Sequence, residues 1–118
     1  MIILFLHTNQ PNNEKSYEQL ARHYPENDHY KLYYAQSLQK SGQYQAALKA
    51  CLNIENPELS QKVLKLQASI KYESNDLVGC KALIDDCPAD DPDTMVNQAC
   101  FLFKVIIDLN IYLKLLKN

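Results

Sequence analysis

The chain has 118 residues and a formal net charge of -2 at pH 7, so it is long enough for one small domain with a buried core. Without an excess of Lys and Arg to neutralise phosphates, nucleic acid is excluded as an expected partner. Its Gly residues are only Gly42 and Gly79, so a glycine-rich phosphate loop cannot form and nucleotide chemistry is excluded as well.

Residues 1–13 are expected to be an N-terminal extension, followed at 14–26 by the last helix of a preceding repeat. An apolar face at helical spacing predicts that helix, and Pro25 ends it: Tyr17, Leu20, Ala21, Tyr24. The apolar run at 1–6 is far shorter than the roughly 20 residues of a membrane span and has no basic flank before it. It indicates neither an anchor nor a signal peptide.

Residues 27–55 are predicted to form a helix hairpin. Asp28 is the expected N-cap of the first helix, and Gly42 suits a tight turn after it. The second helix is expected to begin near Gln43. The two helices carry these apolar stripes: Leu32, Ala35, Leu38, and then Tyr44, Ala47, Leu48, Cys51.

Residues 56–85 are predicted to form a second hairpin. Asn56 is an expected cap and Pro57 suits the first helical position. Asn75 takes the place of the turn Gly, because Asn tolerates left-handed backbone angles better than most residues. The closing helix carries this stripe: Leu77, Cys80, Leu83, Ile84.

After the second hairpin, residues 86–93 are expected to be an acidic, Pro-containing linker. A calcium loop is the alternative, but Cys87 lies where a ligand is needed and no Gly sits at the sharp turn. Residues 94–104 are predicted to be the first helix of a further repeat. Residues 105–118 then form an atypical apolar C-terminal helix, packed or exposed, whose Lys and Asp residues make it a poor membrane span.

The two hairpins repeat one another 33 positions apart. The matching pairs are Ala35 and Ala68, Gly42 and Asn75, Tyr44 and Leu77, Ala47 and Cys80, Cys51 and Ile84. A period near 34 with small residues at fixed offsets is typical of tetratricopeptide repeats. The expected fold is therefore all-α, with helix-turn-helix repeats stacked as a short right-handed solenoid. Five residues are assigned to packing: Tyr44, Ala47, Leu64, Ala68, Leu77.

No catalytic residue, cofactor or metal is expected from this sequence. The four Cys residues at positions 51, 80, 87 and 100 lack a close C-x-x-C pair, and buried free thiols in a reducing intracellular compartment are the simplest interpretation. A zinc site with His23 and His29, a disulfide and a reactive thiol are the alternatives. The His residues have no nucleophile or carboxylate partner visible in the sequence, so the chain is not expected to be an enzyme and no small-molecule substrate is expected.

Several runs of residues are more specific than the generic repeat. They are SYEQL at 16–20, YKLYYAQSL at 30–38, NPE at 56–58, VLKLQASIKY at 63–72, NDL at 75–77 and VNQAC at 96–100. In this order and spacing they resemble the tetratricopeptide repeat protein 30 family, the Fleer-like subunits of the intraflagellar transport B complex. The resemblance covers roughly residues 14 to 104.

The resemblance implies a non-catalytic scaffold. Members of the family are longer superhelices that enclose an extended segment of a fellow transport subunit. The implied role is anterograde intraflagellar transport, cilium assembly and polyglutamylation of axonemal tubulin, in the cytoplasm and in the cilium at its axoneme and base. Residues 1–13 and those from Val105 onward depart from the family pattern, so the sequence is expected to represent a truncated form or an N-terminal-region fragment.

The first helix of each hairpin in a tetratricopeptide array lines a concave groove. Aligning Gly42 with Asn75 places eight residues on that face as candidate partner contacts: Leu32, Tyr33, Gln36, Lys40, Lys65, Leu66, Ser69, Tyr72. Their mixture of aromatic, basic and amide groups suits an extended peptide.

The alternative function is a generic peptide-binding adaptor or co-chaperone that binds an acidic tail. Such a clamp needs Lys, Arg and Asn on successive first helices. Lys40 and Lys65 are present, but Tyr33, Leu66 and Tyr72 dilute the charge, so this function ranks second.

Overall fold

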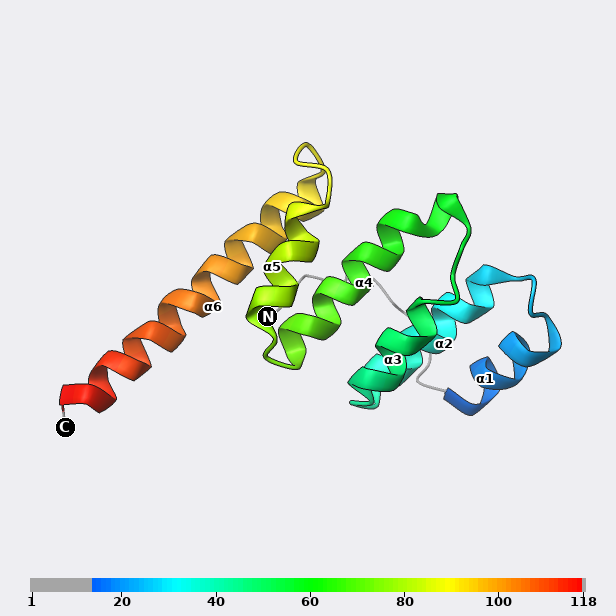
Figure 1. Cartoon of the computed structure of the whole chain (residues 1–118), viewed down its shortest axis with the longest axis horizontal. Helices are drawn as coiled ribbons and strands as arrows, with labels where there is room; N and C mark the ends of the chain where they lie inside the picture. Colours follow the sequence, from blue (N-terminus) through cyan, green and yellow to red (C-terminus); the bar gives the residue numbers. More distant parts are fainter. Residues whose placement is uncertain (1–13, 118) are drawn as a thin grey trace.

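The computed structural model describes residues 14–117, and they form an elongated stack of helices with principal extents of 56 × 32 × 22 Å. Figure 1 shows the helices following one another along the long axis, with no strand in the described range. The elements in chain order are α1 (Glu14–His23), α2 (Asp28–Lys40), α3 (Tyr44–Cys51), the short 3-10 helix η1 (Pro57–Leu59), α4 (Ser60–Glu73), α5 (Leu77–Asp85) and α6 (Pro92–Lys117). The expectations for residues 1–13 lie outside the described range.

Two helix hairpins, α2–α3 and α4–α5, make up the middle of the stack. The predicted turn residues Gly42 and Asn75 both adopt positive φ, at 80° and 64°. The hydrogen bonds around them are equivalent: the Gln43 N–H donates to the Leu38 carbonyl at 2.9 Å, and the Asp76 N–H donates to the Lys71 carbonyl at 2.8 Å. Both turns are therefore the glycine-type C-terminal helix motif, which confirms the predicted alignment of the repeats and the all-α tetratricopeptide fold.

The hydrophobic core follows the predicted stripes. One cluster joins both hairpins and contains Leu32, Ala35, Leu38, Ala47, Cys51, Leu59, Leu66 and Ile70; a second contains Ala68, Tyr72, Cys80 and Ile84. Ala35 and Ala47 have no exposed surface, and Tyr44 packs against the first cluster, as predicted. Leu64 and Leu77 are half-buried.

The predicted N-cap of α2 was wrong by one residue. Asn27 is the cap, and its side-chain oxygen accepts hydrogen bonds from the His29 and Tyr30 N–H groups at 3.0 and 3.3 Å. Asp28 instead contacts a segment distant in the sequence. Its Oδ2 accepts hydrogen bonds from the Glu55 and Asn56 N–H groups at 2.9 and 2.8 Å. The carboxylate thereby ties the start of α2 to the loop before the next hairpin.

The second hairpin begins as predicted. The Asn56 side chain accepts from the Glu58 N–H at 2.9 Å, and Pro57 is the first residue of η1. All four Cys residues are free thiols; Cys51, Cys80 and Cys87 are buried and Cys100 is half-buried.

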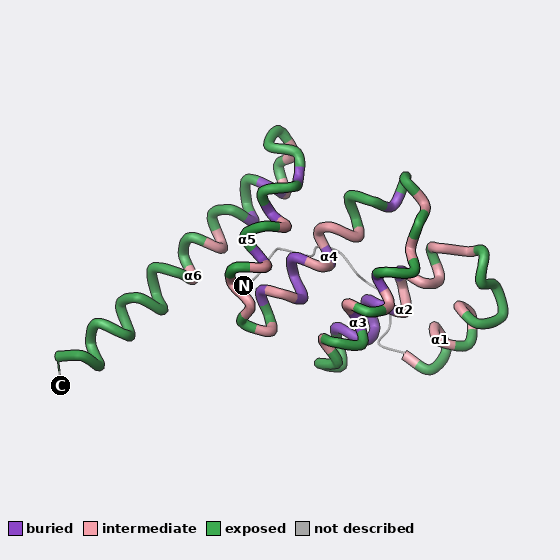
Figure 2. Tube along the Cα trace, in the orientation of Figure 1, coloured by how far each residue is buried: buried purple, intermediate pink, exposed green. Residues whose placement is uncertain are grey.

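The third repeat does not form a hairpin. Position 108 is 33 residues beyond Asn75, yet Asp108 lies inside α6 and the helix continues without a turn. Pro92 and Asp93, expected in the linker, form the first turn of α6, where Pro is well tolerated. Figures 1 and 2 show the second half of α6 extending away from the stack with its surface exposed. Within the described range, no helix meets the length and apolarity needed to cross a membrane.

Candidate partner-binding site

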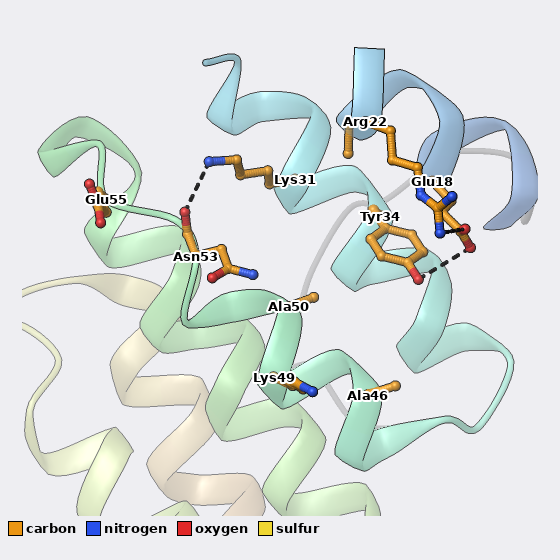
Figure 3. A pocket seen from close by; sticks show the side chains of 10 residues that line it. Glu18, Arg22, Lys31, Tyr34, Ala46, Lys49, Ala50, Asn53 and Glu55 are labelled. Carbon is orange, nitrogen blue, oxygen red and sulfur yellow. Dashed lines mark hydrogen bonds and ion pairs between the residues drawn. The ribbon is translucent and has the colours of Figure 1, made fainter. Parts of the chain in front are cut away.

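A cavity of about 560 Å³ opens between α1, α2 and α3. Its floor and walls come from all three helices and from the loop that follows α3 (Figure 3). The lining residues are Glu18, Ala21, Arg22, Lys31, Tyr34, Ala46, Lys49, Ala50, Asn53 and Glu55. Small side chains from α3 leave the space open, whereas the longer ones around it carry charges of both signs.

Tyr34 links the two helices on one side of the cavity. Its hydroxyl donates a hydrogen bond to Glu18 Oε2 at 3.4 Å, and Glu18 Oε1 pairs with the Arg22 guanidinium at 2.7 Å. Figure 3 shows these three side chains converging from α1 and α2. Burial, together with the negative charges of Glu18 and Glu14, raises the pKa of the Tyr34 hydroxyl, so this group stays a neutral donor.

Lys31 forms the opposite side of the cavity. Its ammonium donates to the Asn53 carbonyl at 3.2 Å and pairs with Asp28 Oδ1 at 3.1 Å. Burial opposes ionisation of Asp28, but the hydrogen bonds from Lys31 and from two backbone N–H groups outweigh it and lower the pKa of this carboxyl. The rim is therefore held by an ionised network that joins α2 to the inter-hairpin loop.

The cavity presents groups that can bind a ligand through hydrogen bonds and ion pairs. Tyr34, Lys31 and Lys49 offer hydrogen-bond donors, and Glu18 and Glu55 offer acceptors, around a partly apolar space. Such a lining suits a polypeptide segment, which presents both backbone polar groups and side chains. Among residues 14–117, no group of three or more His, Cys, Asp or Glu side chains is placed to hold a metal ion.

The buried thiols are poor nucleophiles. Burial raises the pKa of Cys51 to about 12 and that of Cys80 to about 11. The thiolate is the reactive form of Cys, so both side chains are suited to packing rather than to nucleophilic attack.

Most of the eight residues predicted to line a concave groove lie between helices in this structure. Leu32 and Leu66 belong to the first core cluster and are 2% and 0% exposed. Ser69 is buried and accepts a hydrogen bond from Gln39 Nε2 at 2.7 Å. Tyr72 belongs to the second cluster, and the Lys104 ammonium lies 5.3 Å from its ring centroid.

The remaining four predicted residues are polar or aromatic. Gln36 is buried on α2. Lys65 pairs with Asp91 and Asp93 at 2.7 and 3.1 Å, which connects α4 to the start of α6. Tyr33 is half-buried with its ring 5.9 Å from that of Tyr17, and Lys40 is exposed. Lys40 is thus the exposed member of the predicted set, and Tyr33 keeps part of its surface accessible.

The cavity was not predicted from the sequence, because the residues that line it come from three separate helices. Tyr34 lay within one of the family-like runs, and the four-residue spacing of Glu18 and Arg22 suggests a helical ion pair. Nothing in the sequence, however, indicated that Ala46 and Ala50 of α3 would face those groups across an open space.

The comparisons with known proteins agree with the resemblance. Intraflagellar transport protein 70A of Xenopus laevis is 47% identical over 88 residues, which cover 75% of this chain and 14% of that protein. The protein of the same name in Danio rerio is 42% identical over 93 residues, covering 79% of this chain and 14% of its own length. The tetratricopeptide repeat protein 30 homolog of Caenorhabditis elegans is 38% identical over 88 residues, covering 75% and 13%.

No protein-family model matches the chain. The chain spans about 14% of the length of the Xenopus relative, so the similarity concerns one segment of a much longer repeat protein. Within that segment the identity and the helix-hairpin fold agree, and the chain belongs to the tetratricopeptide repeat protein 30 family, which includes the intraflagellar transport 70 proteins.

Proposed function

We propose that this chain is a non-catalytic scaffold segment of the intraflagellar transport machinery that holds an extended segment of another transport B subunit. The proposal rests on the family to which this repeat stack belongs. The stack also has an open cavity of about 560 Å³ beside its first hairpin. Tetratricopeptide stacks have extended surfaces suited to holding a partner.

The cavity supports this role through its donors and acceptors. An extended segment that passes between α1 and α3 meets the Tyr34 hydroxyl, the Lys49 ammonium and the Glu55 carboxylate. Ala46 and Ala50 leave room for its side chains. Tyr33 and Lys40 are proposed as further contacts on the predicted groove face, and the six other members of that set support it by packing.

The finer roles are part of the same proposal. A subunit that takes part in anterograde transport is located in the cytoplasm and in the cilium, both at the ciliary base and at the axoneme. Cilium assembly and polyglutamylation of axonemal tubulin then depend on the cargo that such transport delivers. The names of the relatives support the transport role itself.

A co-chaperone clamp is less well supported by the charges. Lys65 is already paired with Asp91 and Asp93, so it is a poor ligand for an acidic tail. Lys40 alone provides too little positive charge for such a clamp.

The variant Ala46→Arg tests whether the cavity is the partner-binding site, because it places a long side chain in the open space. Its matched control is Gln45→Arg, because Gln45 is also exposed on α3 but does not line the cavity. The tagged full chain is expressed in ciliated cells, and co-purified proteins are identified by mass spectrometry. We expect transport B subunits with the unchanged chain and with Gln45→Arg, and a loss of at least tenfold with Ala46→Arg.

Two results contradict the proposal. Recovery of chaperones without transport subunits would favour the adaptor function. Equal recovery of transport subunits with both variants would show that the cavity is not the contact. Circular dichroism of both variants checks that each remains folded.

A further inference from the structure

Two charged pairs beside the cavity between α1, α2 and α3 are completed by the fold itself. The Glu18 carboxylate pairs with the Arg22 guanidinium at 2.7 Å and accepts a hydrogen bond from the Tyr34 hydroxyl at 3.4 Å. The Lys31 ammonium pairs with Asp28 Oδ1 at 3.1 Å. Because these acids and bases already have partners of opposite charge, they do not require a charged ligand.

Lys49 and Glu55 are the lining residues whose charges the fold leaves unpaired. Within residues 14–117, neither the Lys49 ammonium nor the Glu55 carboxylate forms an ion pair or a hydrogen bond. Figure 3 shows Lys49 on α3 beside Ala46 and Ala50, and Glu55 on the loop that follows α3. A segment that displaces water from either charge has to supply a group of the opposite sign, since burying an unpaired charge is costly.

The groups on the α1 and α3 sides of the cavity that can still form hydrogen bonds are mainly donors. The Arg22 guanidinium has several N–H groups, its side chain is 78% exposed, and one of its terminal nitrogens pairs with Glu18. Both carboxylate oxygens of Glu18 already have partners, which are Arg22 and Tyr34. Lys49 adds further N–H donors. These two sides therefore suit an acceptor, and a carboxylate forms strong, charge-assisted hydrogen bonds with such cations.

We propose that the partner segment in this cavity presents an Asp or Glu side chain to the Lys49 ammonium. The inference rests on the proposed function, in which the cavity holds a segment of a transport B subunit, and it names the chemistry of that segment. The small side chains of Ala46 and Ala50 leave room beside Lys49 for a carboxylate to approach. The segment has an isolated acidic residue, because Glu55 repels a run of acidic residues.

A phosphorylated side chain is a less suitable anion for this position. It carries about two negative charges near neutral pH, whereas Lys49 provides one unpaired positive charge and Glu55 contributes a negative charge to the same cavity. A single carboxylate therefore matches the unpaired charge at Lys49 more closely.

The test is carbodiimide cross-linking of the complex that the tagged full chain recovers from ciliated cells. A carbodiimide activates a carboxylate, and an amine in contact with that group then displaces a urea to form an amide bond. Mass spectrometry is expected to find Lys49 joined in this way to an Asp or Glu of a transport B subunit. Lys62 is the matched control, because it is exposed on α4 and does not line the cavity. No comparable cross-link is expected at Lys62.

Charge variants of Lys49 test the same contact independently. Lys49→Glu reverses the charge and is expected to lower the recovery of transport B subunits by about tenfold or more. Lys62→Glu makes the same charge change outside the cavity and is expected to leave the recovery unchanged. Lys49→Arg keeps the positive charge but lacks the primary amine, so it is expected to recover far more than Lys49→Glu while losing the cross-link. Circular dichroism checks that each variant remains folded.

Failure of this inference is distinguishable from failure of the proposed function. The carboxylate contact is wrong if Lys49→Glu and Lys62→Glu recover equal amounts, or if Lys49 in the recovered complex has no cross-link to a carboxylate. Loss of recovery with Ala46→Arg in the same experiment would then still assign the partner to the cavity. Loss of the complex on phosphatase treatment would assign a phosphate to Lys49 and overturn the proposal. An unchanged chain that recovers no transport B subunit would overturn both.

Discussion

Gln39 Nε2 donates a hydrogen bond to Ser69 Oγ at 2.7 Å, and both side chains are buried. Gln39 belongs to α2 and Ser69 to α4, so this bond joins the first helices of consecutive hairpins. Gln39 also donates to Glu73 Oε1 at 3.2 Å. The inter-repeat contact therefore combines apolar packing with a directional polar link that fixes how one hairpin sits on the next.

Replacement of Gln39 by Ala is expected to lower the free energy of unfolding by about 1–3 kcal/mol, because it leaves the buried Ser69 hydroxyl without this donor. Urea denaturation measures the change. The control is Gln61→Ala at an exposed site of α4, where a change within about 0.5 kcal/mol is expected. Equal effects of the two substitutions would argue against a specific link.

The turn at Gly42 is expected to be sensitive to backbone handedness. Its φ is 80°, and a Cβ there would meet no heavy atom within 4 Å, so Gly42→Ala adds strain without a clash. We expect a loss of about 1–2 kcal/mol in the free energy of unfolding. Gly42→Asn should lose less, because Asn75 adopts this conformation in the second hairpin; a larger loss than for Ala would contradict that reasoning.

Ala47 is expected to tolerate no larger side chain. It is 0% exposed within the first core cluster, so Ala47→Leu should cost about 1–3 kcal/mol through overpacking. The neighbouring Ala46 is exposed, and Ala46→Leu should change stability by less than about 0.5 kcal/mol. Chemical denaturation of both variants makes the comparison, and an unchanged midpoint for Ala47→Leu would disprove the close packing.

Asp28 is expected to make stability depend on pH. Its pKa is lowered in the folded state despite the opposing effect of burial, so its contribution is present above the unfolded pKa of about 3.9 and is lost as the pH falls through the folded value. Asp28→Asn should therefore destabilise the protein at pH 7 and matter little near pH 2. Unfolding of the Asn variant and the unchanged chain at both values tests this, with the exposed Asp90→Asn as control. A constant difference between the two pH values would contradict it.

The thiols are expected to differ in their reaction with an alkylating agent. Burial raises the pKa of Cys51 to about 12 and that of Cys80 to about 11, whereas Cys100 is only half-buried. At neutral pH, mass spectrometry should find Cys100 modified first in the native protein, and Cys51 and Cys80 modified only on unfolding. Rapid native modification of Cys51 would show that its helix opens readily.

The sequence was sufficient to predict the hairpins, because their signals are local. Gly42 and Asn75 occupy equivalent turns, and the small residues at positions 35 and 47 are fully buried. The N-cap was misplaced because Asn27 and Asp28 are both good caps. Only the position of the Glu55 and Asn56 N–H groups shows why the second of them is used elsewhere.

The candidate site was harder to predict because it depends on how repeats stack. The pattern that places Leu32 and Leu66 on one face of a helix cannot distinguish a groove from the contact with the next helix. In the structure these two side chains pack inside the core. The cavity needs α1 and α3 at a particular distance, and no local run of residues encodes that distance.

The continuity of α6 through position 108 has a mechanical consequence. In the two hairpins, one left-handed residue reverses the chain and returns the following helix to its neighbour. At Asp108 the backbone remains right-handed and helical, so the residues that follow continue the same helix away from the stack. The handedness of a single residue thus decides whether the chain adds a layer to the stack or projects an arm from it.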